Sequence, residues 1–187
     1  MMGKMGHVWL AAHQVAINYA TVVFMIPVSV SSATMARVAQ AMGQEDARLA
    51  RARGFLGLSC SLVLVLPSIL VILTMPQWVA GLYTPEISVI QAAIPLLFAV
   101  AFLQLFDATY ITAQGALRGL KDVNGPLLIS LSFWVFGLPA AWWLGIEMGQ
   151  GAVGLWWGMV VGIAMTAVLL VWRFHWCSAR TIREAAA

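Results

Sequence analysis

Long apolar runs, separated by short polar connections, dominate the pattern of this sequence. An α-helix needs about 20 mostly apolar residues to cross the roughly 30 Å hydrocarbon layer of a bilayer. Five runs meet that length, at residues 8–36, 55–75, 87–113, 126–145 and 152–172. The pattern therefore predicts an all-α fold, a polytopic transmembrane helix bundle with five membrane-spanning helices, which forms a single transmembrane domain over residues 1–187.

The connections contain signals for helix ends. Gly43 is expected to stop the first helix. Glu45 and Asp46 suit the start of a short, separate helix that ends in arginines and lies at the membrane surface. Thr84 is expected to cap the start of the third membrane helix.

Composition decides the class of protein. Hydrophobic residues make up 62% of the chain and charged residues only 9%, whereas a soluble domain has about 25% charged residues. The chain is therefore an integral membrane protein, and the lipid bilayer is its first partner. The net charge of +3 does not indicate a nucleic-acid partner, because the basic residues lie in the connections between apolar runs.

Basic residues are confined to alternate connections. All of the 10 Lys and Arg residues except Lys4 follow the first, third or fifth run, at Arg37, Arg48, Arg51, Arg53, Arg118, Lys121, Arg173, Arg180 and Arg183. Cytoplasmic loops of membrane proteins carry such an excess. The distribution predicts that these connections and the C-terminus are cytoplasmic. Trp172 and Trp176 are then expected at the inner membrane interface.

Asp107 is the only acidic residue inside an apolar run. A carboxylate at membrane depth costs about 2.5 to 3.5 kcal/mol on insertion scales, so it normally faces a protein interior or a wet cavity. Gln104, Tyr110 and Gln114 lie at helical spacing from it and extend one polar stripe. We interpret Asp107 as the functional site and the other three as cavity-lining residues. The alternatives are a structural carboxylate that is hydrogen-bonded to a neighbouring helix, or a helix that ends early and leaves Asp107 near the lipid headgroups.

A second polar track follows the first run. Its uncharged members share one side of the predicted helix, at Gln14, Asn18, Thr21, Ser29 and Ser32. One interpretation has Gln14 and Asn18 lining a solute path. The other, which we favour for uncharged side chains, is hydrogen bonding between helices.

Glycines form a third track near the C-terminus. Gly154, Gly158 and Gly162 recur every four residues, a spacing that allows close approach of two helices. The partner helix lies either in the same bundle, which is the more economical use, or in a second copy.

Residue patterns of catalysis are absent from the sequence. It contains no phosphate-binding Gly-Lys loop, no nucleophile elbow and no paired carboxylates, and its three histidines are far apart. Cys60 and Cys177 have neither the number nor the spacing for a metal site or a disulfide framework. We therefore expect a protein that is not an enzyme and that has no cofactor.

Several segments carry a family resemblance. They are AAHQVAINYATVVFMIPVSVSSATMARVAQAMG, LYTPE, FDATYITAQGALRGLKD, FGLPAAWWLG and GLWWGM. Together they resemble the C-terminal half of a NorM-type transporter of the multidrug and toxic compound extrusion (MATE) family. The resemblance covers nearly the whole chain. It implies that the five helices correspond to helices eight to twelve of twelve, a partial C-terminal lobe.

The resemblance also implies a function. It is a secondary active multidrug efflux antiporter of the bacterial inner membrane, which exchanges small cationic amphiphilic drugs for sodium ions or protons. Asp107 falls where such proteins carry an acidic residue implicated in cation coupling, so a sodium ion at Asp107 is one expectation. The missing N-terminal lobe of the same transporter is an implied partner. Leu103 stands where some NorM-type relatives have a tyrosine, which leaves the choice between sodium and proton open.

Two other functions are weighed against the antiporter. One is a non-transporting membrane assembly module that associates through the glycine track, with Asp107 structural. The other is a lipid-linked saccharide flippase of the same superfamily. Such a flippase is expected to carry cationic residues at membrane depth to meet a pyrophosphate, and this chain has none there.

Overall fold

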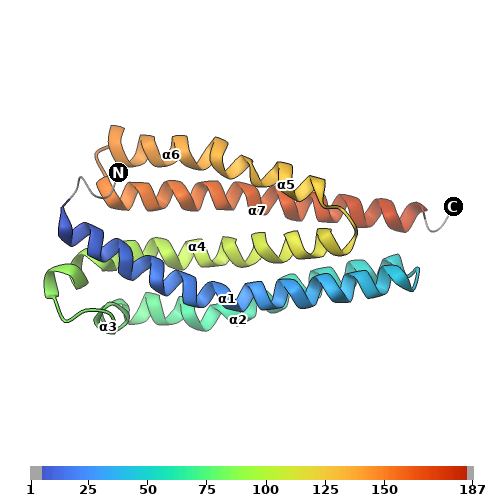
Figure 1. Cartoon of the computed structure of the whole chain (residues 1–187), viewed down its shortest axis with the longest axis horizontal. Coiled ribbons are helices and arrows are strands. Elements are labelled where there is room, and N and C mark those ends of the chain that lie inside the picture. The colour runs from blue at the N-terminus through green and yellow to red at the C-terminus, as the bar shows by residue number, and fades with distance from the viewer. Residues whose placement is uncertain (1–5, 185–187) are drawn as a thin grey trace.

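Helices make up almost all of residues 6–184, the part of the chain that this computed structural model describes. Five helical segments are long and apolar enough to cross a membrane: α1 (His7–Gly43), α2 (Ala47–Thr74), α4 (Ile87–Gly119), Asn124–Glu147 and α7 (Gly151–Glu184). They run side by side, and α1 begins and α7 ends at opposite ends of the bundle (Figure 1). No strand occurs in residues 6–184. The predicted all-α bundle of five helices is confirmed.

The second helix differs from the prediction at its start. The segment from Ala47 to Arg53, expected to be a separate surface helix, is the beginning of α2 itself. Asp46 caps it by accepting a hydrogen bond from the backbone N–H of Leu49 at 2.9 Å. The residues between Asp46 and Phe55 are mostly strong helix formers, so nothing interrupts the helix before it enters the apolar run.

The third membrane helix has a different cap from the one expected. The N-cap of α4 is Glu86 and the helix begins at Ile87, so Thr84 is not its cap. Thr84 accepts a hydrogen bond from the backbone N–H of Glu86 at 3.2 Å, a turn that precedes the helix. A short helix that was not predicted, α3 (Pro76–Gly81), lies between α2 and this turn.

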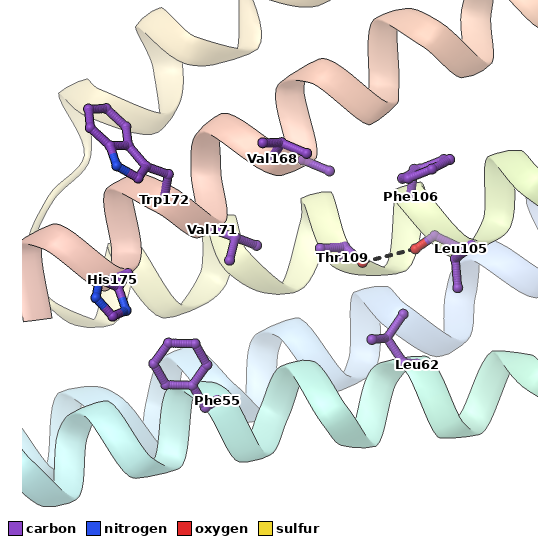
Figure 2. Close-up of a pocket in the computed structure, with 10 residues that line it drawn as sticks. Phe55, Leu62, Leu105, Phe106, Thr109, Val168, Val171, Trp172 and His175 are labelled. Carbon is purple, nitrogen blue, oxygen red and sulfur yellow. Dashed lines mark hydrogen bonds between the residues drawn. The ribbon is translucent and has the colours of Figure 1, made fainter.

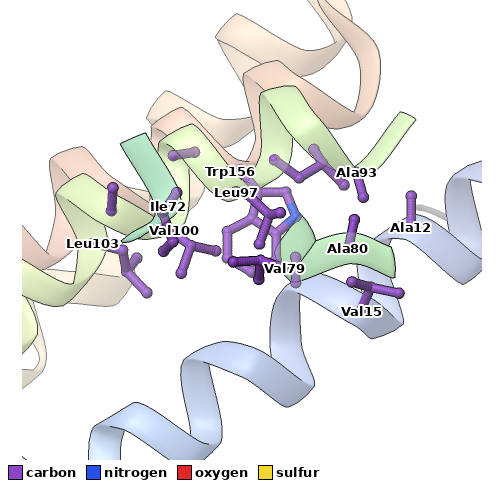
Figure 3. Close-up of a cluster of buried hydrophobic side chains, with 14 of the residues drawn as sticks. Ala12, Val15, Ile72, Val79, Ala80, Ala93, Leu97, Val100, Leu103 and Trp156 are labelled. Carbon is purple, nitrogen blue, oxygen red and sulfur yellow. The ribbon is translucent and has the colours of Figure 1, made fainter. Parts of the chain in front are cut away.

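The centre of the bundle is α4, which lies between α7 on one side and α1 and α2 on the other (Figure 1). Its contact with α1 is close because Gly115 packs against Ser31, and the Ser31 hydroxyl donates to the Ile111 carbonyl at 2.7 Å. Near the end of the bundle where α1 begins, buried side chains from α1, α2, α3, α4 and α7 form one apolar core around Leu97, Val100 and Trp156 (Figure 3).

The fourth segment is irregular and lies at the edge of the bundle. It consists of α5 (Asn124–Ser130), η2 (Phe133–Gly137), α6 (Leu138–Trp142) and η3 (Trp143–Glu147), where η2 and η3 are π-helical turns. It packs mainly on α7. Gly158 and Gly162 of α7 approach Ala141 and Gly137 so closely that a Cβ atom would clash at either glycine. The glycine track is thus used inside the bundle.

Arginines gather at one end of the bundle, where α1 and α4 end and α2 begins. Arg53 of α2 donates to the carbonyl of Arg37 of α1 at 2.9 Å. Arg118 and Arg173 lie near the same end of α4 and α7. The single basic residue predicted for the other side, Lys4, lies outside the described residues.

Candidate functional site

Asp107 lies in the second half of α4 and faces α1 and α2. It lines a small cavity with Gln104, with Val65 of α2, and with Val23 and Pro27 of α1. The cavity has about 10 Å³ of free volume, room for about one water molecule. Its walls are apolar apart from Asp107 and Gln104. A carboxylate is therefore held at a junction of three helices, as the isolated acidic residue in the apolar run predicted.

The carboxylate of Asp107 has no hydrogen-bond or ion-pair partner within residues 6–184. The nearest arginine along α4 is Arg118, roughly 16 Å away for eleven residues of helix, and its guanidinium donates to Gln114 instead, at 3.0 Å. An ionised carboxylate without a partner at this depth is costly. The contact expected of a purely structural carboxylate, a hydrogen bond to a neighbouring helix, is not found among the described residues.

Gln104 is buried beside Asp107 and connects the cavity to two other helices. Its Oε1 accepts from the Ser68 hydroxyl of α2 at 2.9 Å, and the Ser68 hydroxyl is 2.9 Å from the Tyr19 hydroxyl of α1. Its Nε2 is buried and has no partner in the described part of the chain. Both N–H donors of this amide are therefore without a partner, in a residue that lines the same cavity as Asp107.

Sequence reasoning did not identify Tyr19 and Ser68. Ser68 is a single hydroxyl-bearing residue in apolar surroundings, and Tyr19 directly follows Asn18 of the polar track. Neither pattern separates a site residue from a lipid-facing one. Tyr19 and Ser68 are 49 residues apart in the sequence, and Ser68 and Gln104 are 36 residues apart. Only the packing register of α1, α2 and α4 brings the three side chains together. The only local signal of a site residue was the position of Ser68 directly after Pro67.

Tyr110 and Gln114 belong to a different cluster at the arginine-rich end. The Gln114 amide donates to the Tyr110 hydroxyl at 3.4 Å and to the Ser130 hydroxyl of α5 at 3.3 Å. The polar stripe on α4 thus has two parts. Gln104 and Asp107 face α1 and α2, whereas Gln114 joins α4 to α5.

Gln14 and Asn18 lie on an exposed face of α1 and do not line the Asp107 cavity. The Gln14 amide donates to Asn18 Oδ1 at 3.2 Å. The hydroxyls of Thr21, Ser29 and Ser32 each donate to a carbonyl one turn earlier in the same helix. Hydrogen bonding between helices, the interpretation we favoured for this track, is therefore not what these side chains do within residues 6–184.

Relatives among curated proteins share this sequence over nearly its full length. Multidrug resistance protein NorM of Burkholderia vietnamiensis is 38% identical over 180 residues, which are 93% of this chain and 39% of that protein. The protein of the same name from Aliivibrio fischeri is 34% identical over 181 residues, 94% of this chain and 39% of the relative. The chain thus spans about two fifths of the length of these relatives.

Solved structures show the same fold. The crystal structure of the eukaryotic MATE transporter AtDTX14 superposes with a TM-score of 0.81 at 20% identity, covering 94% of this chain and 40% of that one. A crystal structure of MATE in complex with MaL6 superposes with a TM-score of 0.83 at 16% identity, covering 91% and 38%. The names of these relatives describe resistance proteins and transporters, in agreement with the expectation that the chain is not an enzyme.

The family model described as MatE matches residues 1–143. Five packed membrane helices, NorM relatives over nearly the whole sequence and MATE structures with the same fold point the same way. The chain belongs to the MatE family.

Proposed function

We propose that this chain is part of a secondary active multidrug efflux antiporter in which Asp107 couples ion entry to drug exit. The observation that carries the proposal is the unpartnered carboxylate of Asp107 in a small cavity at the junction of α1, α2 and α4. The names of the NorM relatives describe multidrug resistance. We propose small cationic amphiphilic drugs as the substrates, because a positive charge can neutralise Asp107.

Exchange follows from the cost of an ionised, unpartnered carboxylate in a medium of low dielectric. A proton, a sodium ion or a cationic drug can each neutralise Asp107, and one carboxylate serves one of them at a time. Release of the ion therefore requires arrival of the drug, or the reverse. Gln104 lines the same cavity and its Nε2 has no partner among the described residues, so in this proposal its side chain turns to donate to the ionised carboxylate during the exchange.

The coupling ion in this proposal is a proton or sodium. A proton needs only the carboxylate. Side-chain oxygens around the cavity come from Asp107 and Gln104 alone, and Gln104 Oε1 already accepts from Ser68. A sodium ion would have to complete its shell with water or with groups outside residues 6–184.

The exposed polar face of α1 has a place in the same scheme. Gln14 and Asn18 are uncovered in the described part of the chain, and we assign them to the drug cavity between this lobe and the missing N-terminal lobe of the same transporter.

The arginine-rich end of the bundle is assigned to the cytoplasmic side of the bacterial inner membrane, which also makes the C-terminus cytoplasmic.

The test is Asp107→Asn in the complete transporter. The amide keeps the shape of the side chain and removes its charge. Efflux of a cationic dye such as ethidium is measured in membrane vesicles under an imposed sodium or proton gradient, and is normalised to folded protein. We expect ion-driven efflux to be abolished while the folded amount stays near that of the wild type. Asp122→Asn, the matched control outside the apolar run, should retain efflux.

The opposite pattern would overturn the proposal. If Asp107→Asn lowered the amount of folded protein and the remaining protein kept full specific activity, Asp107 would be structural. Dependence on only one of the two gradients in the wild type would identify the coupling ion.

A further inference from the structure

A large groove lies on the side of α4 away from Asp107. Leu105, Phe106 and Thr109 of α4 form its floor, while Asp107 points to another side of the same helix. α2 and α7 form the two walls, with Phe55 and Leu62 facing the groove from α2 (Figure 2). Its volume is about 580 Å³, within the range of ligand sites.

The walls of this groove offer almost no hydrogen bonds. Its single hydroxyl, that of Thr109, donates to the Leu105 carbonyl of its own helix at 3.0 Å. Val168 on the α7 wall is 61% exposed although it lines the groove. In a membrane, such a surface is filled by hydrocarbon and not by water.

One end of the groove is cationic. His175 lies there opposite Phe55 (Figure 2), and Arg51 Nη2 is 3.1 Å from His175 Nδ1. The Arg51 guanidinium also lies over the Phe55 ring, 5.7 Å from its centroid. No carboxylate pairs with Arg51 within residues 6–184. An unpaired guanidinium therefore stands where the apolar groove ends.

Tryptophans place this end at headgroup level. Trp172 lines the groove and is 67% exposed, and Trp176 follows one turn later with 52% exposure. Exposed tryptophans of membrane proteins concentrate at the bilayer interface. Any occupant that matches the whole groove must be apolar along its length and anionic at this end.

We propose that the groove binds a glycerophospholipid with an anionic headgroup. One acyl chain lies between α2 and α7, and the headgroup phosphate contacts Arg51 and His175. Arginine suits this role because its guanidinium forms paired hydrogen bonds with phosphate oxygens. This lipid site requires only that the chain spans a membrane. The proposal therefore does not depend on the proposed drug transport.

Lipid binding is tested on the purified protein in detergent by native mass spectrometry. Phosphatidylglycerol and phosphatidylcholine with identical acyl chains are titrated separately. We expect the first phosphatidylglycerol to bind about fivefold more tightly than phosphatidylcholine, the contribution of one basic residue near an anionic headgroup. Equal affinity for the two lipids would overturn the assignment of the charged end.

Two pairs of variants locate the site. Val168→Trp fills the groove, and Val63→Trp is its control, because Val63 lies outside the groove on α2 with the same 61% exposure. We expect Val168→Trp to weaken both lipids about tenfold by displacing buried methylenes, and Val63→Trp to change neither. Arg51→Gln should remove the preference for phosphatidylglycerol, whereas Arg48→Gln, an exposed arginine one turn away, should keep it.

A crosslinking experiment separates lipid from protein as the occupant. A photoreactive amino acid at position 168 is activated in native membranes, and the adducts are identified by mass. A phospholipid adduct at position 168 supports the proposal. A peptide adduct means that another helix covers the groove and overturns it, as would equal effects of the Val168→Trp and Val63→Trp variants.

Discussion

Two aspartates on the same stretch of chain have opposite surroundings. Asp107, inside α4, has no partner among residues 6–184. Asp122, in the connection after α4, accepts from Arg173 Nε at 2.6 Å and Nη2 at 3.2 Å, and from the backbone N–H of Gly125 at 3.1 Å. One carboxylate therefore has no partner in the described part of the chain, and the other is held by an ion pair and a backbone hydrogen bond.

The partners around a carboxylate decide whether its charge is stabilised within the folded chain. Burial by itself raises the pKa of Asp122, but the hydrogen bonds from Arg173 and Gly125 and the charge of Arg173 outweigh it, so the pKa lies below its ordinary value. The ionised form of Asp122 is thus the stable one, and it holds the connection between α4 and α5 against α7. At Asp107 no described group stabilises the charge, and a mobile cation can take that role.

Removal of the cation from the fixed pair should have the largest effect on stability. Arg173→Gln leaves Asp122 with the Gly125 N–H at 3.1 Å and a weak contact from the Cys177 thiol at 3.7 Å. The Arg173 side chain is 35% exposed, so solvent screens the pair and we expect a loss of about 1 kcal/mol. Thermal unfolding followed by tryptophan fluorescence should show a Tm lower by about 2–4 °C for a chain of this size.

Arg180→Gln is the control for that substitution. Arg180 pairs with Glu184 at 2.7 Å, but both side chains are more than 60% exposed, so its Tm should not change measurably. In the complete transporter that we propose, ion-driven efflux per folded molecule should be unaffected by Arg173→Gln. If it were abolished, the two aspartates would not differ in role as we describe.

A smaller effect is expected at Gly125, which packs directly against the Arg173 guanidinium. The Cβ of Gly125→Ala would displace the guanidinium from Asp122, while alanine gains helix propensity in α5. The net loss should be about 0.5 kcal/mol. Gly43→Ala, at a helix end with open space around it, should cost nothing. In the Arg173→Gln background the cost of Gly125→Ala should disappear; if it persists, the alanine acts through something other than the ion pair.

Much of this arrangement could be predicted from local pattern. Five apolar runs gave the helices, and the isolation of Asp107 in one of them identified the candidate site, because both depend on composition within a single run. The four-residue spacing of the glycines indicated close packing without naming the partner helix.

Contacts between distant segments could not be predicted in this way. Arg173 and Asp122 are 51 residues apart, and in the sequence both belong simply to the basic connections. The same holds for Ser68 and Gln104, which meet only through the register of α2 on α4. The start of α2 was misjudged for a local reason: charged residues suggested a surface helix, although Asp46 already supplied the cap of a continuous one.

The smallest expected effect is the loss, at acidic pH, of the part of the unfolding free energy that Asp122 contributes. Because its folded-state pKa is depressed, the ionised form stabilises the folded protein above the ordinary carboxyl pKa of about 3.9, and this stabilisation is lost as the pH falls through the folded-state value. Unfolding of wild type and Asp122→Asn is compared from about pH 6 down to about pH 3. All other carboxyls are common to both proteins, so the difference between their unfolding free energies isolates Asp122.

We expect the wild type to be more stable than Asp122→Asn at about pH 6, and this difference in unfolding free energy to narrow below about pH 4. Parallel curves would mean that the contact with Arg173 does not depend on the charge of Asp122, and the contrast with Asp107 would fail.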